Sequence, residues 1–170
     1  MAKSHRGEVK LHPYRDQWHK AFLKERAVIE KELGGRVFEI EHIGSTAVPE
    51  MSSRLIIDIL VGVDRLEELD EVEGVLADMG YARSSQSHGP RHRFYVHEDQ
   101  QGYHLHFLET RILRDTSYVR FRDALIADPR LAKEYKEHKI RLVGNFKCDA
   151  AWYEVEKARW IKAWLQRPRA

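Results

Sequence analysis

Apolar residues recur along this chain at two spacings, and each spacing predicts one kind of element. Repeats of three and four residues predict amphipathic helices. These helices are expected at about Tyr14–Leu33, Leu66–Met79, Ser117–Ala127 and Pro129–Gly144, and from after Asp149 to about Gln166. The two glycines after the first segment supply the left-handed conformation that commonly ends a helix.

Runs rich in β-branched and aromatic residues predict the strands. They lie at Val37–His42, Leu55–Val63, Arg93–Glu98 and Tyr103–Leu108, with a shorter candidate at Tyr81–Arg83. The segment Asp99–Gly102 has the length of a hairpin connection. The pattern predicts one α/β domain over residues 1–170, with residues 1–10 frayed. We expect a mixed, twisted sheet of about four or five strands, an amino-terminal helix and a carboxy-terminal helical layer.

One carboxylate interrupts the most apolar of these runs. Leu55–Val63 is apolar on both faces, which is typical of a central strand covered on both sides, and Asp58 stands in its middle. A buried charge is costly unless it is paired, bound to metal or protonated. Asp58 therefore calls for an explanation beyond packing.

Alternation of side chains assigns each histidine on a predicted strand to one strand face, as it does for Asp58. His104 and His106 share one face of their strand, because side chains alternate along a strand. His42 shares its face with Ile40 and ends beside Gly44-Ser45. The chain has ten histidines in all. Six of them show no ligand-like spacing: His5, His12, His19, His88, His97 and His138.

Composition limits the classes of function. Hydrophobic residues make up 42% and charged residues 33%, as in a globular protein. A net charge of +2 makes no case for a nucleic-acid or membrane surface. No apolar run approaches the roughly 20 residues of a membrane span, and the amino terminus lacks a signal-peptide core. The single cysteine, Cys148, cannot form an internal disulfide, which fits a reducing cytoplasm.

The run Glu41–Pro49, EHIGSTAVP, is the most specific of several matches to the GrpB, or UPF0157, family. The others are Ile57-Asp58-Ile59, His104-Leu105-His106, Phe121-Arg122-Asp123 with Pro129, Glu134-Tyr135, and Tyr153 with Lys157. The chain is identified as a member of this family, whose members adopt a nucleotidyltransferase-like fold. The resemblance implies that the Gly44-Ser45 turn holds nucleotide phosphates and that Asp58 holds a divalent metal such as magnesium.

Two departures from the family pattern flank the motif. Glu50 stands where the family usually has glycine, which removes a residue that adopts left-handed backbone freely. Arg54-Leu55 stands where the family usually has Lys-Pro, so a cation is kept but with a different geometry toward phosphate. We therefore expect a loop of altered shape.

The acid set of an active nucleotidyltransferase is incomplete here. Enzymes of this fold usually carry a second acid two residues after the first, because two magnesium ions bridge the triphosphate. Leu60 occupies that position. Imidazoles prefer zinc, copper, nickel or iron to magnesium. We therefore hypothesise that His42, Asp58, His104 and His106 converge on a cleft that binds a transition metal or positions an anion. The alternative is a buried hydrogen-bonded network with no ligand.

Further residues are candidates for contacts with an anionic substrate. Gly44, Ser45 and Thr46 could present amides and hydroxyls to phosphate, or could simply form a tight turn. Arg54, Arg91 and Arg93 could reach a triphosphate, or could be solvated surface charges.

Two classes of function stay open. The first is a nucleotidyltransferase or a nucleotide-binding or anion-binding relative of one, with Asp58 as the catalytic metal-binding acid and a nucleoside triphosphate as ligand. The second is a non-catalytic module that binds a protein partner or a second copy of the chain. The family resemblance implies this second class, because related domains are fused to dephospho-CoA kinase as folding accessories.

Overall fold

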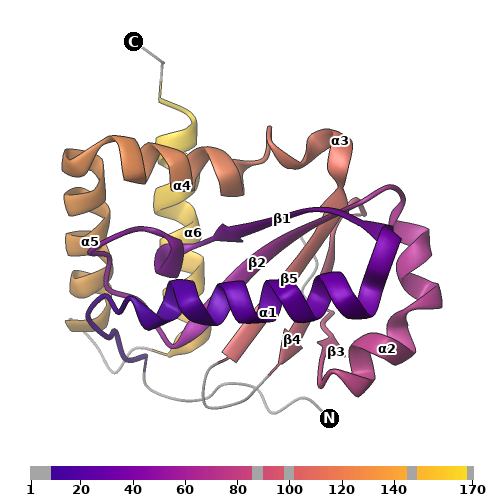
Figure 1. Cartoon of the computed structure of the whole chain (residues 1–170). Helices are drawn as coiled ribbons and strands as arrows, with labels where there is room; N and C mark the ends of the chain where they lie inside the picture. Colours follow the sequence, from indigo (N-terminus) through magenta and orange to yellow (C-terminus); the bar gives the residue numbers. More distant parts are fainter. Residues whose placement is uncertain (1–8, 86–89, 98–101, 145–148, 168–170) are drawn as a thin grey trace.

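A five-stranded mixed sheet, in the order β1-β2-β5-β4-β3, forms the centre of the molecule (Figure 1). The computed structural model describes residues 9–85, 90–97, 102–144 and 149–167. The strands are β1 (Val37–Ile43), β2 (Ile56–Val63), β3 (Ala82–Arg83), β4 (Arg93–His97) and β5 (Gly102–Glu109). β2 and β5 are parallel, and the other neighbouring pairs are antiparallel.

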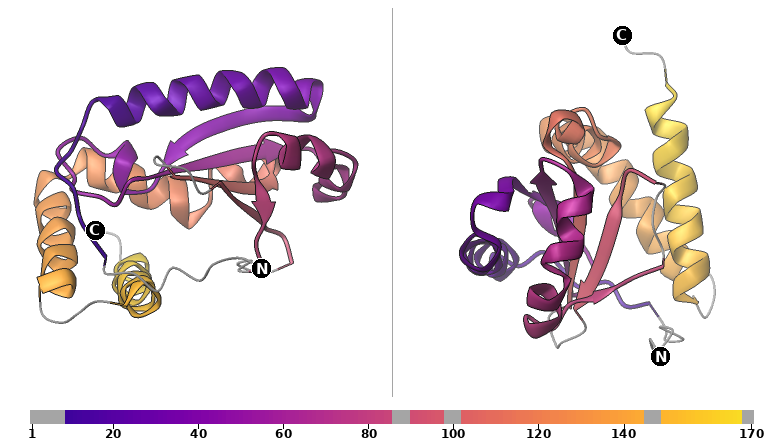
Figure 2. Two further views of the ribbon diagram at one scale, coloured as in Figure 1. Left: turned by 90° about the horizontal axis from the view of Figure 1, so that it is seen from below. Right: turned by 90° about the vertical axis from the view of Figure 1, so that its right-hand side faces the viewer.

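Helices cover both faces of the sheet (Figure 2). The α-helices are α1 (Gln17–Leu33), α2 (Glu73–Asp78), α3 (Thr110–Leu113), α4 (Ser117–Ala127), α5 (Pro129–Gly144) and α6 (Ala150–Leu165). Short 3-10 helices are η1 (Gly34–Arg36), η2 (Ser45–Ala47) and η3 (Leu66–Glu71). α1, η3 and α2 lie against one face, and α3 to α6 lie on the other side of the sheet.

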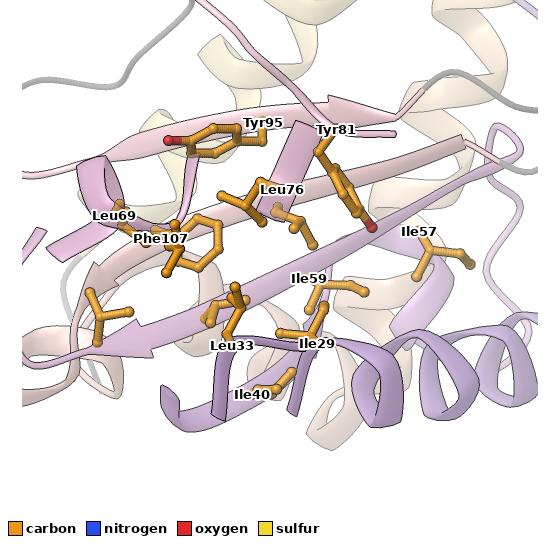
Figure 3. Close-up of a cluster of buried hydrophobic side chains, with 14 of the residues drawn as sticks. Ile29, Leu33, Ile40, Ile57, Ile59, Leu69, Leu76, Tyr81, Tyr95 and Phe107 are labelled. Atoms are coloured by element: carbon orange, nitrogen blue, oxygen red, sulfur yellow. The ribbon is translucent and has the colours of Figure 1, made fainter. Parts of the chain in front are cut away.

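The face of the sheet under α1 carries the main hydrophobic core (Figure 3). Alternate residues of β2 and β5, such as Ile57, Ile59 and Phe107, point to this face and are fully buried. Ile29 and Leu33 of α1 pack against them from the helix side (Figure 3). The apolar side chains that alternate along the strands thus pack against the apolar stripe of α1 in one continuous layer.

The opposite face is built differently. A small apolar cluster, which includes Leu60 and Leu113, fills the end of the sheet beneath α3 and α4. A separate cluster joins Val48 and Met51 of the η2 loop to α4, α5 and α6. Between these clusters, three polar residues lie on this face: Asp58 of β2 and His104 and His106 of β5.

The expected α/β architecture is confirmed: the chain forms a mixed five-stranded sheet with an amino-terminal helix and a carboxy-terminal helical layer. Leu66–Met79 is not one helix but η3 followed by α2. The helical period of α6 predicts a buried stripe of Trp152, Val155, Ala158, Ile161 and Leu165. This prediction was wrong for Trp152 and Val155, which are 40% and 55% exposed, and Tyr153 is buried instead.

Several predicted features lie at the amino terminus or in segments outside the described ranges. Residues 1–8, residues 99–101 of the predicted hairpin connection and Cys148 lie outside the described residues, and Gly102 is the first residue of β5. Val9, in the segment expected to fray, is buried against Leu142 and Tyr153. Among the described residues, none of the helices has the length and apolar character needed to cross a membrane.

Candidate metal and anion site

Asp58, His104 and His106 form a compact group on the polar face of the sheet. The parallel register sets Asp58 beside His104 and Leu60 beside His106, so all three side chains share one face. His104 Nδ1 lies 3.3 Å from Asp58 Oδ1, and His106 Nε2 lies 3.6 Å from the same oxygen. One ligand atom from each residue lies within 4.8 Å of the others. We call this group the metal triad, after the metal ion that its three donor atoms could hold.

Aromatic residues pack around His106 of the triad. His92 Nε2 lies 3.1 Å from His106 Nδ1. The rings of Tyr118 and Phe94 pack on His106 with centroid distances of 5.1 and 4.8 Å. These contacts fix the orientation of the imidazole, so that its Nε2 points to Asp58.

The electrostatics of Asp58 favour its charged form. Burial acts to raise the pKa of Asp58, but hydrogen bonds and charge from His104 and His106 hold that pKa well below its usual range. The carboxylate side chain is 29% exposed, so it is partly reachable from solvent. An ionised carboxylate between two imidazoles is a donor set that suits a divalent transition metal.

The turn after β1 closes against the triad. Ile43 pairs with Asp58, and Gly44 follows with a φ of 70°. A Cβ added at Gly44 would meet Asp58 Oδ2 at 2.4 Å, against backbone already in the left-handed region. The turn therefore needs glycine twice over, for its backbone conformation and for the close approach to the carboxylate.

Ser45, the next residue, contacts a buried lysine, Lys139, that is not among the predicted site residues. Lys139 of α5 is fully buried, and its Nζ donates to Ser45 Oγ at 2.8 Å and to the Ser52 carbonyl at 2.6 Å. The ammonium also lies 4.8 Å from the centroid of the Tyr135 ring. Lys139 thus supports the loop of residues 44–54 from beneath.

Other charged residues of α6 and the loop border Lys139. Arg54 Nη2 lies 2.5 Å from Glu154 Oε1, and Lys157 Nζ lies 2.6 Å from Glu154 Oε2. Arg54 and Lys157 also lie over the Tyr153 ring, at 5.7 and 5.6 Å from its centroid. The predicted anion contact Arg54 therefore belongs to a basic group on the same side of the sheet as the triad.

His42 lies apart from the other predicted metal ligands. It pairs with Ile59, whose side chain points into the α1 core, so His42 faces the opposite side of the sheet from Asp58. Its ring stacks on Phe22 at 4.7 Å, and its Nε2 lies 3.0 Å from Thr46 Oγ1. Burial lowers the pKa of His42 to about 4. The charge of Asp58 acts to raise this pKa, whereas His19 and Arg122 act to lower it.

The remaining predicted anion contacts lie away from the triad. Thr46 is buried, and its hydroxyl contacts His42. Arg91 forms an ion pair with Glu109 at 3.7 Å, beyond His106 along β5. Arg93 pairs with Phe107, on the core side of the sheet. The structure therefore joins Gly44, Ser45 and Arg54 to the triad region but not these three residues.

Two residues of the site were missed, and one of them left a signal in the sequence. The buried stripe of α5 is Leu131, Tyr135, Lys139 and Leu142. The apolar repeat in the sequence predicts a stripe of Leu131, Tyr135, His138 and Leu142, with His138 in place of Lys139. A lysine at a stripe position is the sign of a buried cation, since the helical period places its side chain inward. His92 left no such sign, because its contact with His106 depends on strand register.

The chain is similar to known proteins both in sequence and in structure. The family model described as GrpB protein matches residues 8–167. The glutamate-rich protein GrpB of Alkalihalophilus pseudofirmus is 32% identical over 95% of this chain and 96% of its own length. The UPF0157 protein YqkA of Bacillus subtilis is 28% identical over 91% of this chain. A crystal structure of GrpB from Enterococcus faecalis matches with a TM-score of 0.75 and 22% identity, over 92% of this chain and all of that one.

The relatives differ in length. This chain spans 46% of the Bacillus protein and 63% of the UPF0157 protein SCO7215 of Streptomyces coelicolor. The matched region is therefore a unit that also occurs within longer proteins.

Proposed function

This chain belongs to the GrpB family, and from that premise we propose that it binds one divalent transition metal and, through it, a phosphate-bearing ligand such as a nucleoside triphosphate. The observation that carries the proposal is the metal triad, in which two imidazole nitrogens and a carboxylate oxygen converge within 4.8 Å. This donor set suits zinc better than magnesium.

The position of the triad beside the Gly44-Ser45 turn supports phosphate as the ligand. Gly44 is exposed and close to Asp58, so a group approaching the turn also approaches the triad. Ser45 is partly exposed and can donate or accept hydrogen bonds. Lys139 and Arg54 contribute positive charge behind and beside this turn.

The chemistry open to these residues is narrower than that of a two-metal transferase. A bound metal ion would polarise a phosphoryl oxygen as a Lewis acid. Asp58, His104 and His106 would hold it, and Gly44-Ser45 would orient the phosphate. Leu60 offers no second carboxylate on the strand, so the described residues favour a one-metal ligand-binding site over the usual pair of magnesium ions.

Thermal-shift measurements test the proposal directly. Zinc, manganese and magnesium chlorides, each with and without ATP, are added to the wild type, Asp58→Asn and the control His97→Gln. Zinc at about a hundred times its dissociation constant should raise the melting temperature by roughly 5 °C or more in the wild type and the control. ATP should add a further rise only with metal present. An equal response of Asp58→Asn would refute the site.

A protein-binding module is the second candidate, favoured by exposed apolar side chains on α6. Trp152 and Val155 lie three residues apart on one side of the helix and are 40% and 55% exposed. Large exposed apolar groups can mark a protein contact. We expect the double variant Trp152→Ser, Val155→Ser to keep its metal response and to lose any concentration-dependent dimer seen by light scattering. A wild type that stays monomeric at all concentrations would argue against pairing of two copies.

A further inference from the structure

We infer that the basic residues behind the Gly-Ser turn select a ligand with two or more linked phosphates, and that Lys139 takes up a proton when this ligand binds. We call Arg54, Lys136, Lys139 and Lys157 the basic group. The inference rests on the proposed function and deepens it, because it names the ligand class and assigns a positioning role to Lys139.

The ammonium group of Lys139 contacts neutral groups, and among the described residues it forms no ion pair. Its Nζ contacts a hydroxyl, a carbonyl and an aromatic face, at Ser45, Ser52 and Tyr135. Within the described ranges, no carboxylate lies at ion-pair distance from Lys139. Burying an ammonium in such surroundings costs free energy that neutral partners only partly offset.

The charged neighbours of Lys139 add to this imbalance. Burial, followed by the charges of Lys157, Arg54 and Lys136, lowers the pKa of Lys139 to about 7. Glu154 opposes the shift, but its two carboxylate oxygens already bind Arg54 and Lys157. Burial raises the pKa of Tyr135 well above its usual range, so Tyr135 adds no negative charge at pH 7. The region therefore holds a surplus of positive charge.

The residues of the basic group contact separate parts of the loop of residues 44–54, so a single phosphate would not reach all of them. Lys139 reaches Ser45, whose neighbour Gly44 contacts Asp58. Lys136 lies at the far end of the loop, where its Nζ donates to the Glu50 carbonyl at 2.9 Å. A ligand that contacts both the triad side and the Lys139 side of this loop needs more than one anionic group. Inorganic triphosphate is the simplest such probe.

The coupling to protons follows from the charge. An anion seated at Ser45 stabilises the ammonium form of Lys139, because opposite charges a few ångströms apart attract strongly in a region shielded from water. Above pH 7 a fraction of Lys139 is neutral before binding. Binding therefore draws a proton from the buffer at pH 8 and draws little at pH 6, where the ammonium already predominates.

Calorimetry at pH 8 in two buffers of different ionisation enthalpy measures this uptake. Wild type, Lys139→Met, Lys139→Arg and the control Lys133→Met, each first saturated with zinc, are titrated with triphosphate and with inorganic phosphate. Lys133 lies exposed on the same helix as Lys139. We expect Lys139→Met to bind triphosphate about ten to a hundred times more weakly. Lys139→Arg should bind it without the proton uptake shown by the wild type, since arginine stays protonated.

Several outcomes would overturn the inference. They are equal uptake in the wild type and Lys139→Arg, equal affinity for phosphate and triphosphate, and no triphosphate binding by the wild type. A parallel zinc titration of the wild type and Asp58→Asn separates this inference from the proposed function. Zinc binding that depends on Asp58, with no triphosphate binding, refutes the polyphosphate class alone. Loss of both refutes the site as a whole.

Discussion

The two faces of the sheet use the same strands for opposite purposes. On the α1 side, Ile59 and Phe107 are fully buried in a continuous apolar layer. On the other side, their immediate neighbours Asp58 and His106 belong to the metal triad. Because strand side chains alternate, one face can be optimised for packing while the other carries charge. Stability is therefore expected to reside in the α1 face and ligand binding in the triad face.

Substitution of adjacent residues on β5 tests this division most strongly. Phe107→Ala should lower the free energy of unfolding by about 3–5 kcal/mol, because it leaves a cavity in the fully buried core. His106→Gln, one residue earlier, should cost about 1 kcal/mol and remove the response to zinc. Urea denaturation of both variants measures the difference. Equal losses of stability would break the proposed division between the faces.

The turn at Gly44 should combine a smaller loss of stability with loss of metal binding. Gly44→Ala adds a Cβ that would meet Asp58 Oδ2 at 2.4 Å and forces alanine into left-handed backbone. We expect a cost of about 2–3 kcal/mol in unfolding free energy and a weaker response to zinc. Gly74→Ala, where an added Cβ meets nothing within 4 Å, is the matched control. A zinc response of Gly44→Ala equal to that of the wild type would show that the turn does not position the carboxylate.

His42 should make the α1 face sensitive to acid. Its pKa is lowered to about 4 by burial, so the unfolded chain binds more protons than the folded chain between pH 6.5 and 4. This contribution to stability is complete above pH 6.5 and is lost as the pH falls toward 4. Relative to His42→Asn, the wild type should lose about 1–2 kcal/mol between pH 6.5 and pH 5. If the unfolding free energies of the wild type and His42→Asn changed in parallel with pH, the imidazole of His42 would be in contact with solvent and not buried.

Glu50 should show the smallest effect, and in the opposite direction. It adopts a φ of 59°, so the loop keeps a left-handed position although the family glycine is absent. Glu50→Gly should therefore raise the free energy of unfolding by about 0.5–1 kcal/mol, as strain is relieved against the greater freedom of the unfolded chain. Chemical denaturation is sufficient to detect this gain. A destabilised Glu50→Gly would mean that the side chain offsets the strain.

Much of the fold could be predicted because it depends on local periodicity. Alternation placed His104 and His106 on one face of β5, and the apolar run identified β2 as a covered central strand with Asp58 in its middle. Helical repeats located α1, α4, α5 and α6. These signals reflect burial of one side of each element, which any single segment reveals by itself.

The parts that failed depend on how separate segments meet. His42 does share a face with Ile40, as alternation predicts, but the register of β1 against β2 pairs it with Ile59 and not with Asp58. That register is set by the turn and by packing, which periodicity does not contain. Lys139 and Ser45 are 94 residues apart, so their contact is likewise invisible along the chain.

Anomalous X-ray scattering from zinc-soaked crystals tests the central claim most directly. The account predicts one strong peak on the polar face of the sheet, within about 2.0–2.3 Å of Asp58, His104 Nδ1 and His106 Nε2, and no such peak in Asp58→Asn crystals. Zinc bound at other residues, or its absence between these three in saturated wild-type crystals, would contradict it.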